Sequence, residues 1–332
     1  MRVLIVLPGA LGDVIRALPL LGRLRRGAPG ACLGWVVEPL SSPLLEGHPW
    51  LDEVVRVPRR GGLRGAIQAL RAVRAFRPDV ALDLGRGAKS ALFALWSGAR
   101  RRLGFARGDA REASWLVATE RLPEQGSQRA KLEQYLAFGD VLGLPPVEVA
   151  FGLEPTPQER LDAARMLDGL SPPRIAACVG SSCPARRWFS DRTAGALEVL
   201  VARTRGSAVL LGTAADTAFA AAVAQRSQVP LRNLSGRTDL RQLLAILAQV
   251  DVVVGPDSGA LHLAAALGTP VVSLWGATSA VRSAPWGSEH LVVEGRAPCA
   301  PCFLRHCPIG RVCMRGIEVD AVVARAREAL GA

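Results

Sequence analysis

The segment from Val250 to Thr278 reads VDVVVGPDSGALHLAAALGTPVVSLWGAT. Two short apolar runs, residues 250–254 and 270–274, flank an alanine-rich stretch that is typical of a helix. A strand, a helix and a second strand in this order predict a parallel βαβ unit, because parallel strands need a crossover connection. This unit indicates the fold class of the chain.

The same alternation of short apolar runs and longer amphipathic segments continues through the whole chain. The other expected strands are at residues 3–7, 32–37, 54–57, 80–84, 174–179, 208–211 and 290–293. A proline-rich stretch at 144–157 separates two such series and suits a linker. We therefore expect an α/β protein with two doubly wound, Rossmann-like domains that face each other across a cleft. The expected boundary lies between residues 150 and 151.

The composition restricts the class of protein without naming a partner. The 332 residues suit two domains, and 41 basic against 29 acidic residues give a net charge of +12. Such a charge favours binding to acidic partners, such as nucleic acid, anionic membranes or phosphorylated ligands. Lys89 and Lys131 are the only lysines, so part of the excess reflects a preference for arginine. No secretory signal or apolar run of membrane-spanning length is recognised, and we expect a cytoplasmic protein.

The loop after the first expected strand belongs to the stretch LPGALGDVIRALPLLGRL, residues 7–24. Gly9 and Gly12 permit a tight turn, and the helix that follows favours negative charge at its start. The spacing G-x-x-G-D differs from the dinucleotide fingerprint G-x-G-x-x-G. Asp13 is then either a helix-start acid that complements the helix dipole, or a functional carboxylate at the carboxyl end of a strand.

The loop VGSSCPARRWF, residues 179–189, places small polar residues before two arginines. Ser181 and Ser182 offer hydrogen-bond donors for phosphate, and Arg186 or Arg187 offers the countercharge. The alternative is the start of a helix with solvated arginines.

The turn at residues 255–259 is followed by a helix whose first backbone N–H groups, at Ser258, Gly259 and Ala260, have no partner within the helix. Such a helix start suits a pyrophosphate. His262 lies one turn later on the same face, where it contacts phosphate or anchors the loop.

Four of the seven cysteines are close in sequence, as Cys299, Cys302, Cys307 and Cys313. Their spacing C-x2-C-x4-C-x5-C suits a structural zinc ion or reduced thiols, and both alternatives stay open.

Taken together, these motifs resemble glycosyltransferase family 9, the ADP-heptose:lipopolysaccharide heptosyltransferases. The resemblance rests on GDVIRALP (12–19), DVALDLGRGAKSALFALWSGARRRLGF (79–105), PARRW (184–188), the DSGALHLAAALGTPVVSLWGAT block (257–278) and CAPCFLRHCPIGRVCMRGI (299–317). It implies a GT-B fold, with residues 151–318 binding the nucleotide-sugar donor and residues 1–150 binding the acceptor. It also implies that the final helix, 319–330, packs back on the N-terminal domain.

The resemblance also implies roles for individual residues. Asp13 falls on the proposed catalytic base, and Arg186 stands where many relatives have a donor-binding lysine. Asp257 matches a residue expected near the hydroxyls of the donor sugar, while Ser258 and Gly259 match phosphate contacts.

Further positions carry less specific expectations. Asp216 and Thr238 fall near contacts to ribose and adenine. Gly12, Lys89 and Arg102 are placed on the acceptor side. A basic surface for an anionic acceptor or membrane is expected from Arg59, Arg60, Arg64, Arg71, Arg74 and Arg100 to Arg102.

The expected reaction is an inverting, metal-independent transfer of heptose from ADP-heptose to an anionic lipid A–core acceptor. The chain contains no D-x-D metal motif, and arginine with helix N-termini stabilises the leaving diphosphate instead. No cofactor is expected for catalysis, and no nucleic acid. The protein is expected to be a monomer, associated peripherally with the inner face of the inner membrane. The alternatives are a GT-B-type sugar-nucleotide epimerase and a non-catalytic metal-binding scaffold.

Overall fold

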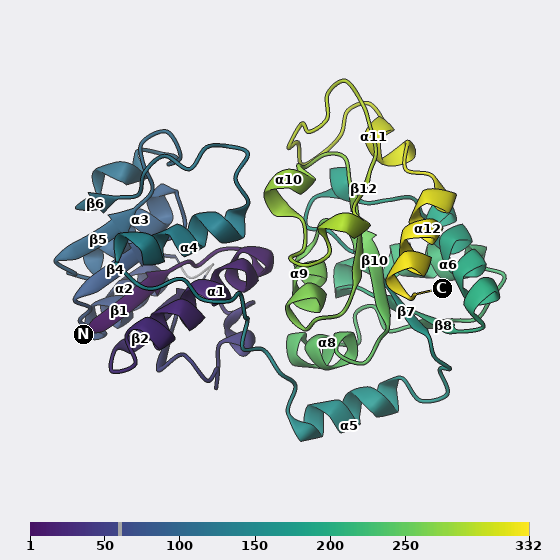
Figure 1. Ribbon diagram of the computed structural model, residues 1–332, viewed down its shortest axis with the longest axis horizontal. Helices are drawn as coiled ribbons and strands as arrows, with labels where there is room; N and C mark the ends of the chain where they lie inside the picture. Colours follow the sequence, from purple (N-terminus) through teal and green to yellow (C-terminus); the bar gives the residue numbers. More distant parts are fainter. Residues whose placement is uncertain (59–61, 332) are drawn as a thin grey trace. The chain divides into compact units, whose positions relative to one another are not determined.

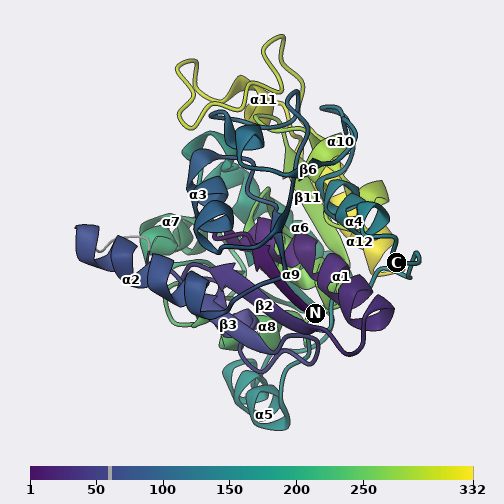
Figure 2. The same ribbon diagram turned by 90° about the vertical axis from the view of Figure 1, so that its left-hand side faces the viewer.

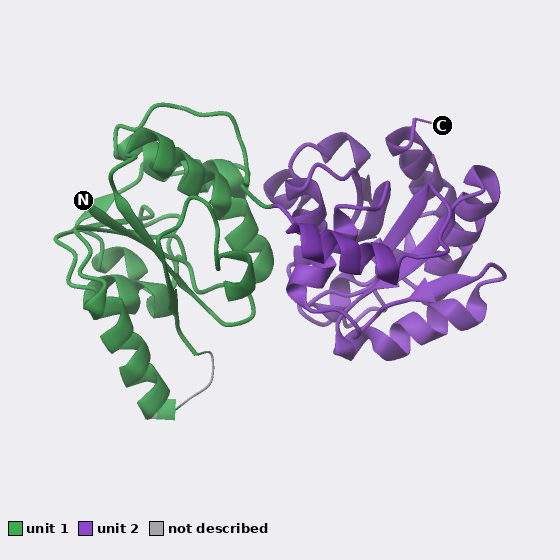
Figure 3. Ribbon diagram, turned by 90° about the horizontal axis from the view of Figure 1, so that it is seen from below, with its two compact units in different colours: residues 1–153 green, residues 154–332 purple. Residues whose placement is uncertain are grey.

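The computed structural model describes residues 1–58 and 62–331, apart from the side chain of residue 63. The chain divides into two compact units, Met1–Leu153 and Glu154–Ala332 (Figure 3). The expected Arg59 and Arg60 of the basic surface lie outside the described residues. Each unit is described below by itself.

Unit 1 is a six-stranded parallel sheet in the order β3-β2-β1-β4-β5-β6, covered by helices (Figure 1). Its strands are β1 (Arg2–Val6), β2 (Cys32–Val37), β3 (Glu53–Arg56), β4 (Val80–Asp83), β5 (Arg101–Gly104) and β6 (Glu120–Arg121). Its helices are α1 (Leu11–Gly27), α2 (Gly62–Ala75), α3 (Ala88–Trp96) and α4 (Lys131–Val141), with the 3₁₀ turns η1 (Ser42–Leu44) and η2 (Ser114–Leu116).

The central strands form because β1, β2 and β4 are almost wholly apolar and can be buried on both faces. In the register, Val6 of β1 lies opposite Val36 on one side and Asp83 on the other. The loops that follow β1, β2 and β4 therefore leave the sheet at one edge, as expected for ligand-binding loops of a parallel sheet.

Unit 2 is a second six-stranded parallel sheet, in the order β12-β11-β10-β7-β8-β9 (Figure 1). Its strands are β7 (Arg174–Cys178), β8 (Ser207–Leu211), β9 (Leu231–Asn233), β10 (Val252–Pro256), β11 (Val271–Trp275) and β12 (Val293–Glu294). Its helices are α5 (Pro157–Met166), α6 (Ser190–Thr204), α7 (Thr217–Arg226), α8 (Leu240–Leu247), α9 (Gly259–Ala266), α10 (Ala280–Ser283), α11 (Val312–Arg315) and α12 (Val319–Ala329), with 3₁₀ turns η3 (Pro184–Arg186), η4 (Ala214–Asp216) and η5 (Glu289–Leu291).

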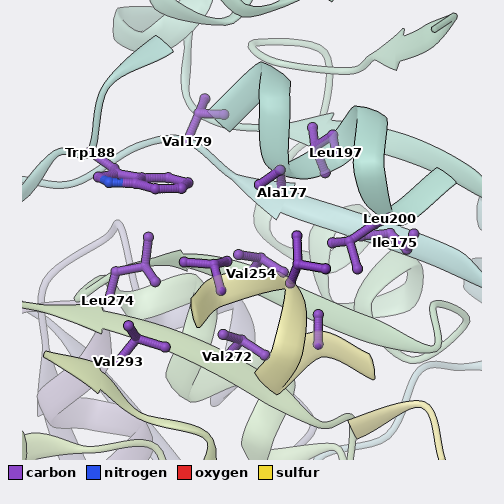
Figure 4. Close-up of a cluster of buried hydrophobic side chains, with 14 of the residues drawn as sticks. Ile175, Ala177, Val179, Trp188, Leu197, Leu200, Val254, Val272, Leu274 and Val293 are labelled. Atoms are coloured by element: carbon purple, nitrogen blue, oxygen red, sulfur yellow. The ribbon is translucent and has the colours of Figure 1, made fainter. Parts of the chain in front are cut away.

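The core of unit 2 lies between the sheet and the helices α6 and α12. Figure 4 shows Ile175, Val254 and Val272 from three strands beside Leu197 and Leu200 of α6. Because this cluster is continuous across β7, β10 and β11, it holds the carboxyl ends of these strands, and the loops after them, at one edge.

The final helix α12 has its apolar face within unit 2. Val322, Val323 and Ala326 are buried in the core of unit 2, and α12 packs on α6 and β11. An amphipathic helix places its apolar stripe on the core in this way. The expectation that this helix packs back on the N-terminal domain stays a prediction.

Among the residues that the structure describes, no helix is long and apolar enough to cross a bilayer. The strands β5, β6 and β9 have no counterpart among the expected strands. They are short and carry charged residues, such as Arg101 and Glu120, so hydrophobic patterning does not reveal them.

Candidate functional site

The first candidate group lies in unit 1, at the start of α1. Asp13 is in the first turn of the helix, and its side chain is 25% exposed. Its Oδ1 atom is 2.7 Å from Arg16 Nη2 and 2.8 Å from Lys131 Nζ at the start of α4. The carboxylate is therefore held by two cations from two helices while part of it remains open to solvent.

The surroundings of Asp13 decide its protonation. Burial by itself raises the pKa of Asp13. The charges and hydrogen bonds of Lys131 and Arg16 lower the pKa by more than burial raises it, so the pKa lies well below the usual range of aspartate. Burial and the charge of Asp13 raise the pKa of Tyr135, whose hydroxyl is hydrogen-bonded to Asp13. Asp13 is thus an ionised carboxylate at neutral pH, which is the form that a general base requires.

The residues placed on the acceptor side have separate partners in unit 1. Lys89 Nζ is 2.6 Å from Glu38 Oε1. Arg102 donates hydrogen bonds to the backbone carbonyls of Val117 at 2.9 Å and Ala99 at 2.8 Å. Gly12 is buried in the first turn of α1. Arg102 therefore supports the fold around β5, whereas Lys89 keeps its ammonium half-exposed.

A buried carboxyl group that is not among the residues predicted from the sequence lies at the end of β4. Asp83 is 7% exposed, and its Oδ1 atom accepts a hydrogen bond from the Gly85 backbone N–H at 3.0 Å. Burial raises its pKa to about 6, opposed in part by hydrogen bonds from Ser90 and Gly85. An aspartate at the end of an otherwise apolar strand is the signal that could have revealed it.

The second candidate group lies in unit 2, where β10 leads into α9. Asp257 Oδ2 is 2.9 Å from Arg186 Nη1 and accepts a hydrogen bond from the Thr278 hydroxyl at 2.9 Å. His262 Nε2 is 3.9 Å from Asp257 Oδ1, and the imidazole is almost fully buried. The loops after β7, β10 and β11 therefore meet at the carboxylate of Asp257.

Three serines lie in the loops that meet here. The Ser181 hydroxyl donates to the Asp257 backbone carbonyl at 3.0 Å, so the loop after β7 is tied directly to the turn before α9. Ser258 is the N-cap of α9, and within the described residues its buried hydroxyl has no hydrogen-bond partner. Ser182 is exposed. The first N–H groups of α9 lack partners within the helix, so this end of α9 together with Arg186 suits an anionic ligand.

A neighbouring ion pair forms around Asp216. Arg187 Nη2 is 2.6 Å from Asp216 Oδ1, and Oδ2 accepts hydrogen bonds from the backbone N–H and hydroxyl of Thr213. Asp216 is only 3% exposed. Its carboxylate is therefore already used within the fold. Thr238 is half-buried in the turn between β9 and α8.

The cysteine-rich segment is fastened beside this group by backbone contacts. Phe303 N donates to the Ala277 carbonyl at 2.8 Å, and Ala185 N donates to the Arg305 carbonyl at 3.1 Å. The Arg311 guanidinium donates to the Arg187 carbonyl at 2.8 Å. The segment therefore supports the loops that carry Arg186 and Thr278.

The thiols of this segment differ in their surroundings. Cys299 is exposed and Cys313 is buried, and none of the seven cysteines forms a disulfide. Within residues 1–58 and 62–331, no group of three or more His, Cys, Asp or Glu side chains is arranged to hold a metal ion. Cys307 Sγ instead accepts a hydrogen bond from the Arg311 backbone N–H at 3.1 Å.

Because hydrogen bonds already hold this segment, we expect purification without chelators to yield less than about 0.2 zinc or iron per chain, with all thiols titratable in denaturant. Elemental analysis and thiol titration measure both quantities. A value near one metal ion per chain, together with four protected thiols, would instead establish a tetrahedral site at Cys299, Cys302, Cys307 and Cys313.

The sequence and the fold of the chain are similar to those of known proteins. The profile of glycosyltransferase family 9 (heptosyltransferase) matches residues 66–313. The chain is 24% identical over 289 residues to the lipopolysaccharide core heptosyltransferase OpsX of Haemophilus influenzae, covering 86% of this chain and 82% of the relative. Among solved structures, it is similar to a family 9 glycosyl transferase of Veillonella parvula, with a TM-score of 0.83, 20% identity, and coverage of 99% and 97% of the two chains. It is also similar to the E. coli heptosyltransferase WaaC with ADP, with a TM-score of 0.76, 22% identity, and coverage of 99% and 100%.

Proposed function

The chain belongs to glycosyltransferase family 9, the heptosyltransferases, and from this premise we propose that it transfers heptose from ADP-heptose to the inner core of lipopolysaccharide. The acceptor is Kdo-lipid A or heptosyl-Kdo-lipid A, and the anomeric centre is inverted. The observation that carries the proposal is the junction of Arg186, Asp257 and the start of α9 in unit 2.

The donor diphosphate would bind at this junction. The N–H groups of Ser258, Gly259 and Ala260 supply backbone donors, and Arg186 supplies a fixed positive charge. Asp257 is paired to Arg186 at 2.9 Å, so its first role would be to orient the guanidinium. Asp257 is also the residue proposed to meet hydroxyls of the donor sugar. Asp216 and Thr238 are proposed near the ribose and the adenine.

The acceptor hydroxyl would lose its proton to Asp13. The resulting oxygen attacks the anomeric carbon of heptose from the side opposite the diphosphate. The carbon–oxygen bond to ADP breaks, and the electron pair leaves with the β-phosphate oxygen. Arg186 and the start of α9 stabilise that charge, as preorganised donors do for a leaving group. On the acceptor side, Gly12, Lys89 and Arg102 are proposed to lie near the bound sugar.

Membership in a heptosyltransferase family favours this reaction over the two alternatives, a sugar-nucleotide epimerase and a non-catalytic scaffold. An epimerase would convert the free donor without an acceptor. The decisive experiment is an assay of ADP release with ADP-heptose and a panel of truncated lipopolysaccharide acceptors. Release that needs no acceptor, or no release with any acceptor, would contradict the proposal.

The cellular setting proposed for this reaction is the cytoplasmic face of the inner membrane, where a lipid-linked acceptor is reached from solution. A peripheral association is proposed, with the enzyme as a monomer. The net charge of +12 supports attraction to an anionic membrane surface.

Transfer should proceed without a divalent metal. Arg186 and the α9 N-terminus supply the positive charge that a metal ion supplies elsewhere, so we expect EDTA to leave the rate within about twofold of its untreated value. The measurement is the rate of ADP release before and after chelation, with a metal-dependent glycosyltransferase treated in parallel as the control. Complete loss in EDTA that magnesium or manganese restores would overturn the proposed leaving-group chemistry.

A further inference from the structure

Apart from the exposed Lys89 in its first turn, the helix α3 in unit 1 is apolar on both of its faces. Its inner face buries Ala91, Phe93 and Ala94. Its outer face presents Leu92, Leu95 and Trp96, whose exposed fractions are 49%, 48% and 48%. A surface helix of a soluble protein ordinarily carries polar side chains outward, so this outer face has the character of a contact surface.

Neighbouring elements extend the apolar area. The turn η2 packs against α3 and exposes Leu116 at 63%, and α2 also packs against α3 and exposes Ile67 at 41%. Figure 2 shows α2 and α3 as neighbouring helices of unit 1.

Arginines border this apolar area. An open pocket of about 670 Å³ is lined by Arg71, Arg74, Arg77 and Trp96. Arg74 Nη1 donates to the Trp96 carbonyl at 3.4 Å. In the part of the chain that the structure describes, no carboxylate lies within ion-pair distance of these three arginines. The positive charge of the pocket is therefore not neutralised by the protein.

The two helices supply no carboxylate of their own. Residues 54–78 and 84–108, which contain α2 and α3, include no aspartate or glutamate, whereas they include thirteen of the 41 basic residues. We call the exposed side chains of Arg71, Arg74, Arg77, Leu92, Leu95, Trp96 and Leu116 the α2–α3 surface.

The combination of apolar and cationic groups identifies the partner. A second copy of the chain would bring the same arginines together, and like charges at a symmetric interface repel. A bilayer of anionic lipids offers phosphates to the arginines and an interfacial zone for leucine and tryptophan. Trp96 lies where the two kinds of group meet, as amphipathic aromatic rings do at membrane interfaces.

We propose that the α2–α3 surface docks unit 1 on an anionic lipid bilayer, with lipid phosphates in the pocket of Arg71, Arg74 and Arg77 and with Leu92, Leu95 and Trp96 in the interfacial zone. The inference deepens the proposed function, on which it rests for its purpose, since a lipid-linked acceptor is held in the same bilayer. The binding itself is independent of the reaction.

The direct test is flotation of the full chain with vesicles of phosphatidylglycerol and phosphatidylethanolamine, compared with vesicles of phosphatidylcholine alone. We expect binding to the anionic vesicles, weakened by salt, and little binding to the neutral ones. Joint replacement of Arg71, Arg74 and Arg77 by glutamine should weaken binding about 100-fold, because each arginine near an anionic surface contributes roughly a fivefold factor.

Joint replacement of Leu92, Leu95 and Trp96 by serine should weaken the same binding at least about tenfold, because apolar area no longer enters the interface. The matched control combines Leu161→Ser on α5, a leucine exposed at 57%, with Arg203→Gln on α6. We expect the control to bind as the unchanged protein does. Thermal melting confirms that each variant is folded.

Unchanged vesicle binding in both surface variants would overturn the proposal. The proposal would also fail if the wild-type protein did not bind anionic vesicles but formed a dimer, and the serine variant did not form that dimer. The surface would then join two copies of the chain. If the protein bound neutral and anionic vesicles equally well, the arginines would have no role in the binding.

A second readout separates this inference from the proposed reaction. With a soluble acceptor stripped of its acyl chains, the serine variant should turn over as the wild type does. With the acceptor embedded in anionic vesicles, its rate should fall in step with its binding. If wild-type protein floats with vesicles yet transfers heptose to neither acceptor, the proposed function fails and the docking surface stands.

Discussion

Replacing Asp13 by asparagine is expected to lower heptosyl transfer by about two orders of magnitude or more, the usual scale for loss of a general base. Asparagine keeps the size of the side chain and one acceptor oxygen but cannot take a proton from the acceptor hydroxyl. Affinity for ADP-heptose should hardly change, because the proposed donor contacts all lie in unit 2. Steady-state kinetics and calorimetry with ADP-heptose measure the two quantities.

The variant also leaves the two cations around position 13 without their carboxylate. Arg16 Nη2 and Lys131 Nζ lie within 3 Å of Asp13, and weakening these hydrogen bonds by removing the negative charge costs about 1–3 kcal/mol of stability. Asp140→Asn is the matched control, because Asp140 forms a different salt bridge between α4 and α1, to Arg23 at 2.8 Å. We expect the control to keep its turnover. If Asp13→Asn retains more than half of the wild-type rate, Asp13 serves only the fold.

The pH dependence of the wild type follows from the same environment. Lys131 and Arg16 hold the pKa of Asp13 well below its usual range, so the carboxylate stays ionised as the pH falls through the ordinary range of aspartate. A pH–rate profile of kcat/KM should therefore show no loss from protonation of Asp13 between about pH 5 and pH 8.

Replacing Arg186 by alanine is expected to weaken binding of ADP-heptose by about 10- to 100-fold, the range for one charge-assisted contact to a phosphate. Asp257→Ala should have a similar effect, because it removes the carboxylate that holds Arg186 at 2.9 Å. Arg186→Lys should restore part of the affinity, since it keeps the charge but loses the planar fork of donors. Calorimetry with ADP and ADP-heptose is the measurement.

A double-mutant cycle separates two roles of Asp257. If Asp257 acts by orienting Arg186, the double variant will be no worse than either single one. If Asp257 also contacts the sugar, the losses will add for ADP-heptose but not for ADP. Arg192→Ala is the control, because Arg192 is as exposed as Arg186, at 25%, and pairs with Glu318 instead. Unchanged affinity and kinetics in both alanine variants would remove Arg186 and Asp257 from the site.

Much of the architecture could be predicted from the order of apolar runs. The runs at 3–7, 32–37 and 80–84 correspond to β1, β2 and β4, and the segment at 250–278 contains β10, α9 and β11. These elements are predictable because buried parallel strands are continuous apolar stretches, which leave a clear local signal. The strands β5, β6 and β9, which lie at or next to a sheet edge, leave no such signal, since half-exposed pairs such as Arg101 with Glu120 are typical of loops.

The sequence could place the candidate residues on loops, but it could not identify the side chains with which they pair. The sequence offers Arg186 and Arg187 as equivalent neighbours. In the fold, Arg186 pairs with Asp257 and Arg187 pairs with Asp216, because these consecutive residues at the end of η3 point in different directions. Asp216 is thereby a buried acid whose carboxylate is paired with Arg187.

The sequence by itself therefore determined the class of fold, the family, and the loops that carry Asp13, Arg186 and Asp257, since each depends on local pattern or on a contiguous motif. Only the tertiary structure decided that Lys131, 118 positions from Asp13 along the chain, holds its carboxylate. It also decided that the apolar face of α12 is buried in the core of unit 2, and that Leu92 and Trp96 of α3 are exposed to solvent. The physical reason is that burial and charge pairing depend on which distant segments the packed core brings together. A local pattern along the chain does not specify these contacts.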